Sequence, residues 1–159
     1  MNLVDTFLKL ISIESETGKE DNILDFIETF LEGNNFQGEI KRNNGGIVAV
    51  PSESSKKIAL VGHVDTVPVV PNQQYEFEND DLIGGRGSVD MKGGIAVILH
   101  SLLENSSEIV GVFYTAEESS YEDNGLNIIM PELLNDFDID FAIILLSLIH
   151  ISEPTRPLH

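Results

Sequence analysis

Three clusters of acidic and histidine side chains give this sequence its capacity for chemistry. The segment GHVDTVP at 62–68 contains His63 and Asp65. The segment GGRGSVDMKGG at 84–94 contains Asp90, and TAEE at 115–118 ends in Glu117 and Glu118. Imidazole and carboxylate groups bind divalent metals and also transfer protons. Because the chain has no cysteine, any metal must be held by His, Asp and Glu.

Each cluster directly follows an apolar segment, and the segments before the first and third clusters read as strands. These segments are 58–61, 82–83 and 109–114. In open α/β sheets, sites form at the carboxyl ends of the strands, so the three clusters are expected to meet at one edge. The spacing agrees, because 27 residues separate position 63 from 90 and another 27 separate 90 from 117. Either interval is long enough for the chain to return to the same edge of a sheet.

The elements that position the clusters follow from the apolar periodicity. Helical spacing predicts helices over 3–10, from 17 to a stop at Gly33, over 92–103, and over 126–134 with an interruption or restart at Pro131. Apolar runs predict strands over 58–61, 109–114 and 141–145, and a hairpin joins 39–41 to 47–50. This alternation predicts an α/β fold with a mainly parallel sheet and helices on both faces.

Taken in order, the motifs GHVDTVP, GRGSVDMKGG and the Glu pair resemble those of the co-catalytic zinc metallohydrolases, which include desuccinylases, N-acetylornithine deacetylases, aminoacylases and glutamate carboxypeptidases. The resemblance covers nearly all of residues 1–145. Within that family, FYTAEESSYEDNGL and DFAIIL are most similar to the succinyl-diaminopimelate desuccinylases of the Gram-positive type. The resemblance implies a zinc-peptidase-like catalytic domain that binds two Zn²⁺, with cobalt as an alternative metal.

The resemblance also implies a role for each motif residue. His63 resembles a ligand of one zinc, Asp90 the carboxylate that bridges both metals, and Glu118 a ligand of the other zinc. Asp65 resembles the carboxylate that orients the His63 imidazole. Glu117 resembles the general base that moves the proton of the attacking water. We expect the adjacent glutamates to act differently because successive side chains at a strand end point to opposite sides.

The implied activity is removal of an acyl group, the succinyl group of N-succinyl-LL-2,6-diaminopimelate, in lysine biosynthesis. One alternative within the family is an N-acetylornithine deacetylase, aminoacylase or dipeptidase. Another is a non-catalytic, incomplete metal-binding fragment. Family members are roughly twice as long or more, with a lid or dimerisation domain and a late histidine ligand, so we expect this chain to be inactive and the parent to be a homodimer.

The last residues depart from the family pattern. LSLIHISEPTR over 146–156 looks like translated sequencing adapter, so we expect 1–145 to be the N-terminal part of the catalytic domain and 146–159 a non-native tail. Glu153 stands several residues too late to match the acidic ligand that the family places after the strand, and neither His150 nor His159 is assigned a role. An incomplete sheet would expose an apolar edge.

The composition limits the kinds of partner that the chain can bind. The 27 acidic groups against 9 basic ones give a formal net charge of −18, which argues against nucleic acid, and no apolar run approaches the ~20 residues of a membrane span. We therefore expect a cytoplasmic protein, and the resemblance implies a small N-acyl amino acid as its substrate. His100 is expected to be a packed or half-exposed helix residue. Arg86 is expected to form a structural ion pair rather than bind a substrate carboxylate, and the acidic run at 76–81 to be a solvated loop.

Overall fold

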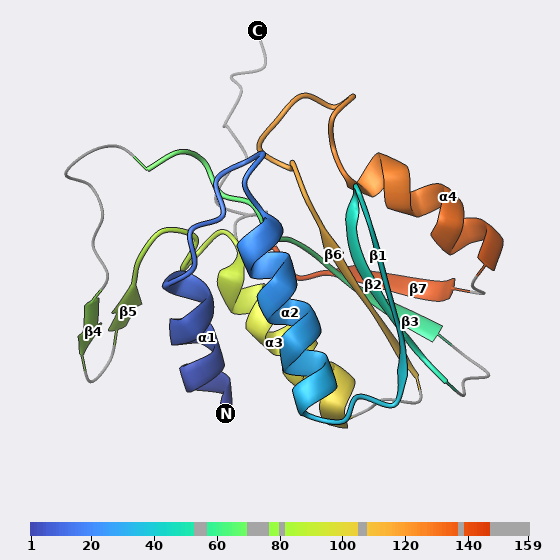
Figure 1. Cartoon of the computed structure of the whole chain (residues 1–159), viewed down its shortest axis with the longest axis horizontal. Coiled ribbons are helices and arrows are strands. Elements are labelled where there is room, and N and C mark those ends of the chain that lie inside the picture. Colours follow the sequence, from blue (N-terminus) through green and yellow to red (C-terminus); the bar gives the residue numbers. More distant parts are fainter. Residues whose placement is uncertain (53–56, 70–76, 80–81, 105–107, 137–138, 147–159) are drawn as a thin grey trace, which may run out of the picture.

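The computed structural model describes residues 1–52, 57–69, 77–79, 82–104, 108–136 and 139–146 (Figure 1). Its largest feature is a five-stranded sheet formed by β1 (Gly38–Asn43), β2 (Gly46–Pro51), β3 (Lys57–His63), β6 (Ile109–Tyr114) and β7 (Ile139–Ile144). The strand order is β1-β2-β6-β3-β7. Strands β6, β3 and β7 are parallel, and the β1–β2 hairpin adds two antiparallel strands at one edge. The expected α/β sheet with a parallel centre is confirmed.

Three helices cover one face of this sheet: α1 (Leu3–Ile11), α2 (Asp21–Gly33) and α3 (Lys92–Glu104) (Figure 1). Their buried stripes pack with Leu60 and Phe113 of the sheet in the larger core cluster. Alternate strand residues, among them Val61 and Val112, point to the other face and contact Ile129 of α4 (Leu126–Asp136). Helices therefore lie on both faces, as the alternating pattern predicted, because neighbouring strand side chains point in opposite directions.

Two helix boundaries differ from expectation. Helix α2 begins at Asp21 instead of near Thr17. Thr17 bonds to another loop and Gly18 adopts a φ of 85°, so neither residue is free to enter the helix. Helix α4 continues through Pro131 without the expected interruption. Pro131 is exposed, and water can solvate the backbone carbonyl that loses its intrahelical partner there.

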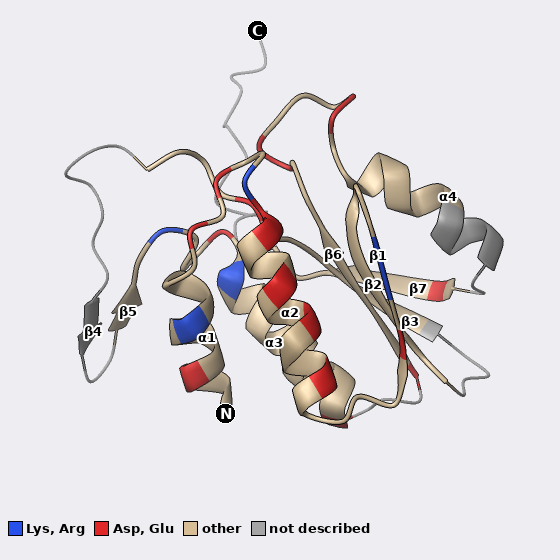
Figure 2. Cartoon of the chain, in the orientation of Figure 1, with Lys and Arg blue, Asp and Glu red and all other residues tan. Residues whose placement is uncertain are grey.

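A small hairpin of β4 (Phe77–Asn79) and β5 (Leu82–Gly84) was not predicted. The acidic run was interpreted as a solvated loop, but Glu78 lies in β4; its other members lie outside the described residues. Acidic residues recur along α2 and in the loops at one end of the sheet (Figure 2). No helix in the described part of the chain is long and apolar enough to cross a bilayer.

Candidate active site

The sequence motifs meet at the carboxyl ends of two neighbouring parallel strands. His63 ends β3, and it lies beside Tyr114, the last residue of β6, in the strand register. Asp90 lies in the turn that leads into α3, and the Glu117–Glu118 pair lies in the turn after β6. Loops that are 27 residues apart in sequence thus converge at one edge of the sheet, as their spacing predicted.

His63 and Asp90 form the closest pair of potential ligand groups in the site. The Nε2 atom of His63 lies 2.8 Å from Oδ1 of Asp90. The other ring nitrogen, Nδ1, lies 3.0 Å from the backbone oxygen of Asp65 and 3.4 Å from its Oδ1 atom. Burial disfavours the charged ring, but hydrogen bonds to Asp65 and Asp90 and their negative charges outweigh it and raise the pKa of His63 to about 9.

Asp65 is completely buried and ties three segments together. Its carboxylate accepts hydrogen bonds from the backbone N–H groups of Glu117 and Glu118, both at 3.0 Å, and from the Thr17 hydroxyl at 2.9 Å. Burial alone would raise the pKa of Asp65, but His63 and these three donors lower it below its usual value. The carboxylate therefore fixes the turn that carries both glutamates against the His63 loop.

The two glutamates have different surroundings. Oε2 of Glu117 accepts hydrogen bonds from the Tyr114 hydroxyl at 3.1 Å and from the Asn124 amide at 2.7 Å. Burial, followed by the charge of Glu117, raises the pKa of Tyr114. Glu118 is exposed and lines a cleft together with Asp90; partial burial and the charge of Asp90 raise its pKa.

The prediction that strand alternation separates the two glutamates was wrong. The glutamates do not alternate along a strand end, because β6 stops at Tyr114 and they lie in the turn beyond it. That turn passes through Ala116, whose φ is 57°. The local backbone therefore separates the two side chains, and the alternation of a β-strand does not apply.

Sequence reasoning missed Thr17, Tyr114 and Asn124 as members of the site. Thr17 lies 48 residues from Asp65, and no local pattern connects them. Tyr114 was recognised only as the end of an apolar strand, and Asn124 only as part of a motif that resembles the family. Lys92 was recognised as a helix start, but it is also buried, and its Nζ atom donates to the Ile13 carbonyl at 2.6 Å.

The geometry of possible metal ligands is partly in place. The imidazole of His63 and the carboxylates of Asp90 and Glu118 are ligand types that suit zinc. Among the described residues, however, no three His, Asp or Glu side chains come together as a group able to hold a metal ion. The described loops thus supply a His–Asp pair with further carboxylates nearby, and not a closed metal cage.

The other histidine, arginine and glutamate residues considered from the sequence do not all lie in the described site. His100 is confirmed as a packed helix residue: its Nε2 atom lies 2.9 Å from Thr6 Oγ1 and its ring lies 5.7 Å from that of Phe30. Arg86 forms no ion pair with any described residue, and the expected structural salt bridge stays a prediction. His150, Glu153 and His159 lie outside the described residues.

A large cavity opens beside this site. It has a volume of about 890 Å³, and Asp90 and Glu118 line it together with Thr66, Val67 and residues 83–89, which belong to β5 and the loop that follows it. This volume falls in the range of small-molecule pockets. A ligand of amino-acid size in this cleft would lie against the carboxylates of Asp90 and Glu118.

Comparisons with known proteins agree with these motifs. A Mycobacterium tuberculosis protein named for succinyl-diaminopimelate desuccinylase is 40% identical over 139 residues, which cover 85% of this chain and 39% of that protein. The succinyl-diaminopimelate desuccinylase of Corynebacterium glutamicum is 36% identical over 132 residues, with coverages of 78% and 36%. The chain therefore spans less than half the length of these relatives.

A solved structure and a family model support the same relationship. The structure of a Staphylococcus aureus tripeptidase superimposes with a TM-score of 0.69 at 27% identity, covering 89% of this chain and 42% of that one. A sequence model described as Peptidase family M20/M25/M40 matches residues 59–159, which include His63, Asp90 and the Glu pair. The match takes in well over half of the chain. The protein therefore belongs to the Peptidase family M20/M25/M40.

Proposed function

We propose that this chain carries the first part of the active site of a metal-dependent amide hydrolase. The observation that carries the proposal is the convergence of His63, Asp90 and the Glu117–Glu118 pair beside a cleft of about 890 Å³. The assigned family, whose named relatives are desuccinylases and peptidases, supports the reaction class. All of these reactions cleave an amide bond with water.

His63 and Asp90 are the residues that we propose as the first metal ligands. Their facing Nε2 and Oδ1 atoms belong to groups that bind zinc directly. Glu118, on the same cleft as Asp90, would hold a second metal ion together with Asp90. When bound, two zinc ions polarise the scissile carbonyl and lower the pKa of the attacking water. The remaining ligands would come from residues beyond the described site.

Glu117 is the proposed general base. The Tyr114 hydroxyl and the Asn124 amide both donate to one of its oxygens, so the carboxylate is held in a fixed orientation. A base must lie within hydrogen-bond reach of the proton it removes, and a fixed orientation maintains that reach. Asp65 supports this geometry because it binds the backbone of Glu117 and faces the ring of His63.

The proposed substrate is N-succinyl-LL-2,6-diaminopimelate, because two relatives with high identity bear the name of its desuccinylase. The similarity to a tripeptidase structure favours a second candidate, a small peptide or N-acetylated amino acid. We also retain the proposal that the isolated chain does not turn over substrate, that 146–159 is a non-native tail, and that the parent protein is a homodimer.

A chimaera tests the proposed reaction. Residues 1–145 would replace the matching portion of the Corynebacterium glutamicum desuccinylase, and zinc-dependent hydrolysis would be assayed against N-succinyl-LL-2,6-diaminopimelate, N-acetylornithine and a tripeptide. We expect activity with the succinylated substrate and a loss of at least about a hundredfold in kcat in Glu117→Gln. A folded chimaera that hydrolyses none of the three substrates would contradict the hydrolase proposal.

A further inference from the structure

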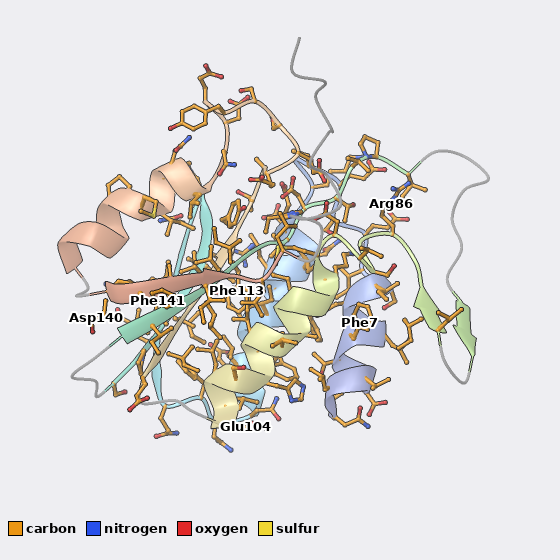
Figure 3. The ribbon with its side chains drawn as sticks, turned by 180° about the vertical axis from the view of Figure 1, so that it is seen from behind. Phe7, Arg86, Glu104, Phe113, Asp140 and Phe141 are labelled. Atoms are coloured by element: carbon orange, nitrogen blue, oxygen red, sulfur yellow. The ribbon has the colours of Figure 1, made fainter. Side chains whose placement is uncertain are left out.

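The cleft beside the site contains one cationic side chain among the described residues that line it. That side chain is Arg86, which shares the cleft wall with Thr66 and the carboxylates of Asp90 and Glu118. Arg86 lies in the loop between β5 and α3, at the opposite side of the molecule from Asp140 and Phe141 (Figure 3). In a chain with 9 basic groups against 27 acidic ones, a cation in this position requires an explanation.

No carboxylate in the described part of the chain neutralises Arg86. The acidic group that senses its charge is Glu16, and the effect on the pKa of Glu16 is the smallest of several. The Glu16 carboxylate already binds Lys19 Nζ at 2.7 Å and the backbone N–H of Val69 at 3.0 Å. Arg86 therefore keeps its guanidinium available to a ligand, although a guanidinium that is half-buried usually pairs with an anion.

A second observation comes from a small recess next to the cleft. Arg86 and Thr66 line both cavities, so the two spaces adjoin. Ser15 also lines the recess; it is 1% exposed, and its hydroxyl has no hydrogen-bond partner. The recess has a volume of about 10 Å³, which is room for a single oxygen atom or water. Within the described part of the chain, the Ser15 hydroxyl has no hydrogen-bond partner and Arg86 has no ion-pair partner, and both side chains line this space of oxygen size.

We propose that Arg86 binds a carboxylate of the substrate in this cleft. Guanidinium groups pair with carboxylates through two parallel N–H···O bonds, which give orientation as well as affinity. The ligand class is then an N-acyl amino acid whose free carboxylate lies along the β5–α3 loop while its amide faces Asp90 and Glu118. This inference rests on the proposed function for the identity of the amide, but the carboxylate contact stands on Arg86 alone.

Binding of small probes to the zinc-loaded chain tests the contact. N-methylsuccinamate presents a carboxylate on the acyl side of an amide, N-acetylglycine presents one on the amino-acid side, and N-methylacetamide presents none. We expect Arg86→Gln to weaken the binding of one of the two carboxylate probes by about tenfold or more, and Arg86→Lys to weaken the binding of the same probe less. The affinity for N-methylacetamide should not change. The probe that responds identifies which carboxylate Arg86 binds.

Lys9→Gln is the matched control, because it removes one exposed cation from α1 without touching the cleft. Amide NMR spectra of each variant establish that it is folded, and the Arg86 Nε–Hε signal should shift as the responding probe is added. Carboxylate affinities that are equal in the wild type, Arg86→Gln and Lys9→Gln would overturn the inference. Absence of measurable carboxylate binding by the folded wild-type chain would overturn it as well.

Zinc titration of the same variants separates this inference from the proposed function. Zinc binding that is equal in the wild type and Arg86→Gln, together with unchanged probe affinity, overturns the role of Arg86 and leaves the hydrolase proposal intact. Probe binding that depends on Arg86 in a chain that binds no zinc supports the carboxylate contact and contradicts the metal site.

Discussion

At the scale of single residues, the site depends on one buried carboxylate that serves several partners. The Asp65 carboxylate accepts hydrogen bonds from the backbone N–H groups of Glu117 and Glu118 and from the Thr17 hydroxyl. It also faces the ring of His63. A fully buried anion is costly unless donors surround it, and these partners supply that compensation. Because the donors come from three separate segments, the carboxylate couples folding of the core to the geometry of the site.

Thr17→Val tests this coupling, since it removes the hydroxyl donor and nearly preserves the side-chain shape. Hydrogen bonds to charged groups contribute about 1.5–3 kcal/mol, so we expect a loss of that size in the free energy of unfolding, measured by urea denaturation. Ser12→Ala is the control, because the Ser12 hydroxyl is exposed and bonds only to the Lys9 carbonyl. A Thr17→Val variant as stable as Ser12→Ala would refute the coupling.

Sequence could identify the motif residues but not all of their partners. His63 and the glutamate pair follow two strands that are parallel neighbours in the sheet, so their convergence was predictable. Asp90 follows β5, which lies in a separate antiparallel hairpin, so this rule does not account for its position. Thr17 was not, because its bond to Asp65 spans 48 residues and exists only after the sheet has formed. The contact of Tyr114 with Glu117 spans three residues, yet it requires the turn at Ala116 to bring them together.

At the scale of elements, the β1–β2 hairpin depends on a close backbone approach. Gly46 begins β2 with a φ of 132°, a conformation that side-chain-bearing residues rarely adopt. A Cβ atom at this position would also collide with the carbonyl oxygen of Phe113 on β6. The turn-rich sequence predicted a hairpin here, and glycine meets both demands at its corner.

Gly46→Ala should therefore destabilise the protein by about 1–3 kcal/mol, because it adds backbone strain as well as a clash. Gly33→Ala is the matched control: it ends α2, and a Cβ atom there meets nothing within 4 Å. We expect Gly33→Ala to be neutral or stabilising by up to about 1 kcal/mol. Thermal unfolding of both variants measures the difference, and equal melting temperatures would contradict this interpretation of the corner.

The element boundaries that sequence misjudged share a cause. Residues near Thr17 have helical periodicity, but Thr17 itself bonds to Asp65 and holds the chain outside α2. Proline usually ends a helix, but Pro131 is exposed in α4, where water can solvate the backbone carbonyl that lacks its helical partner. In both cases the tertiary environment outweighs a local preference, and a local pattern cannot contain that information.

At the scale of the whole molecule, the described part of the sheet ends on one side at the apolar strand β7. Strand β7 is at the sheet edge, and Phe141, Ile143 and Ile144 are 62%, 43% and 62% exposed. An apolar groove of about 420 Å³ lies between β7 and α4, lined in part by Val61 and Met130. The exposed apolar edge expected from the sequence is thus confirmed. Exposed apolar strand edges promote association, in spite of a net charge of −18.

Phe141→Glu should reduce self-association of the chain, because it places a charge on the exposed edge strand. Val4→Glu introduces the same charge on α1, where the replaced side chain is 48% exposed. Sedimentation velocity over a range of protein concentrations should show less oligomer for Phe141→Glu than for Val4→Glu or the wild type. If both variants associate equally, net charge rather than the β7 edge controls association.

The central claim is that the converging loops form a metal site, and zinc titration by calorimetry tests it most directly. His63→Gln removes the proposed ligand, whereas His100→Gln changes a histidine that packs between Thr6 and Phe30 away from the site. We expect the wild type and His100→Gln to bind zinc with the same affinity. We expect the zinc affinity of His63→Gln to be lower by at least about tenfold. Equal zinc affinity in all three folded proteins, or no binding by any of them, would contradict the central claim.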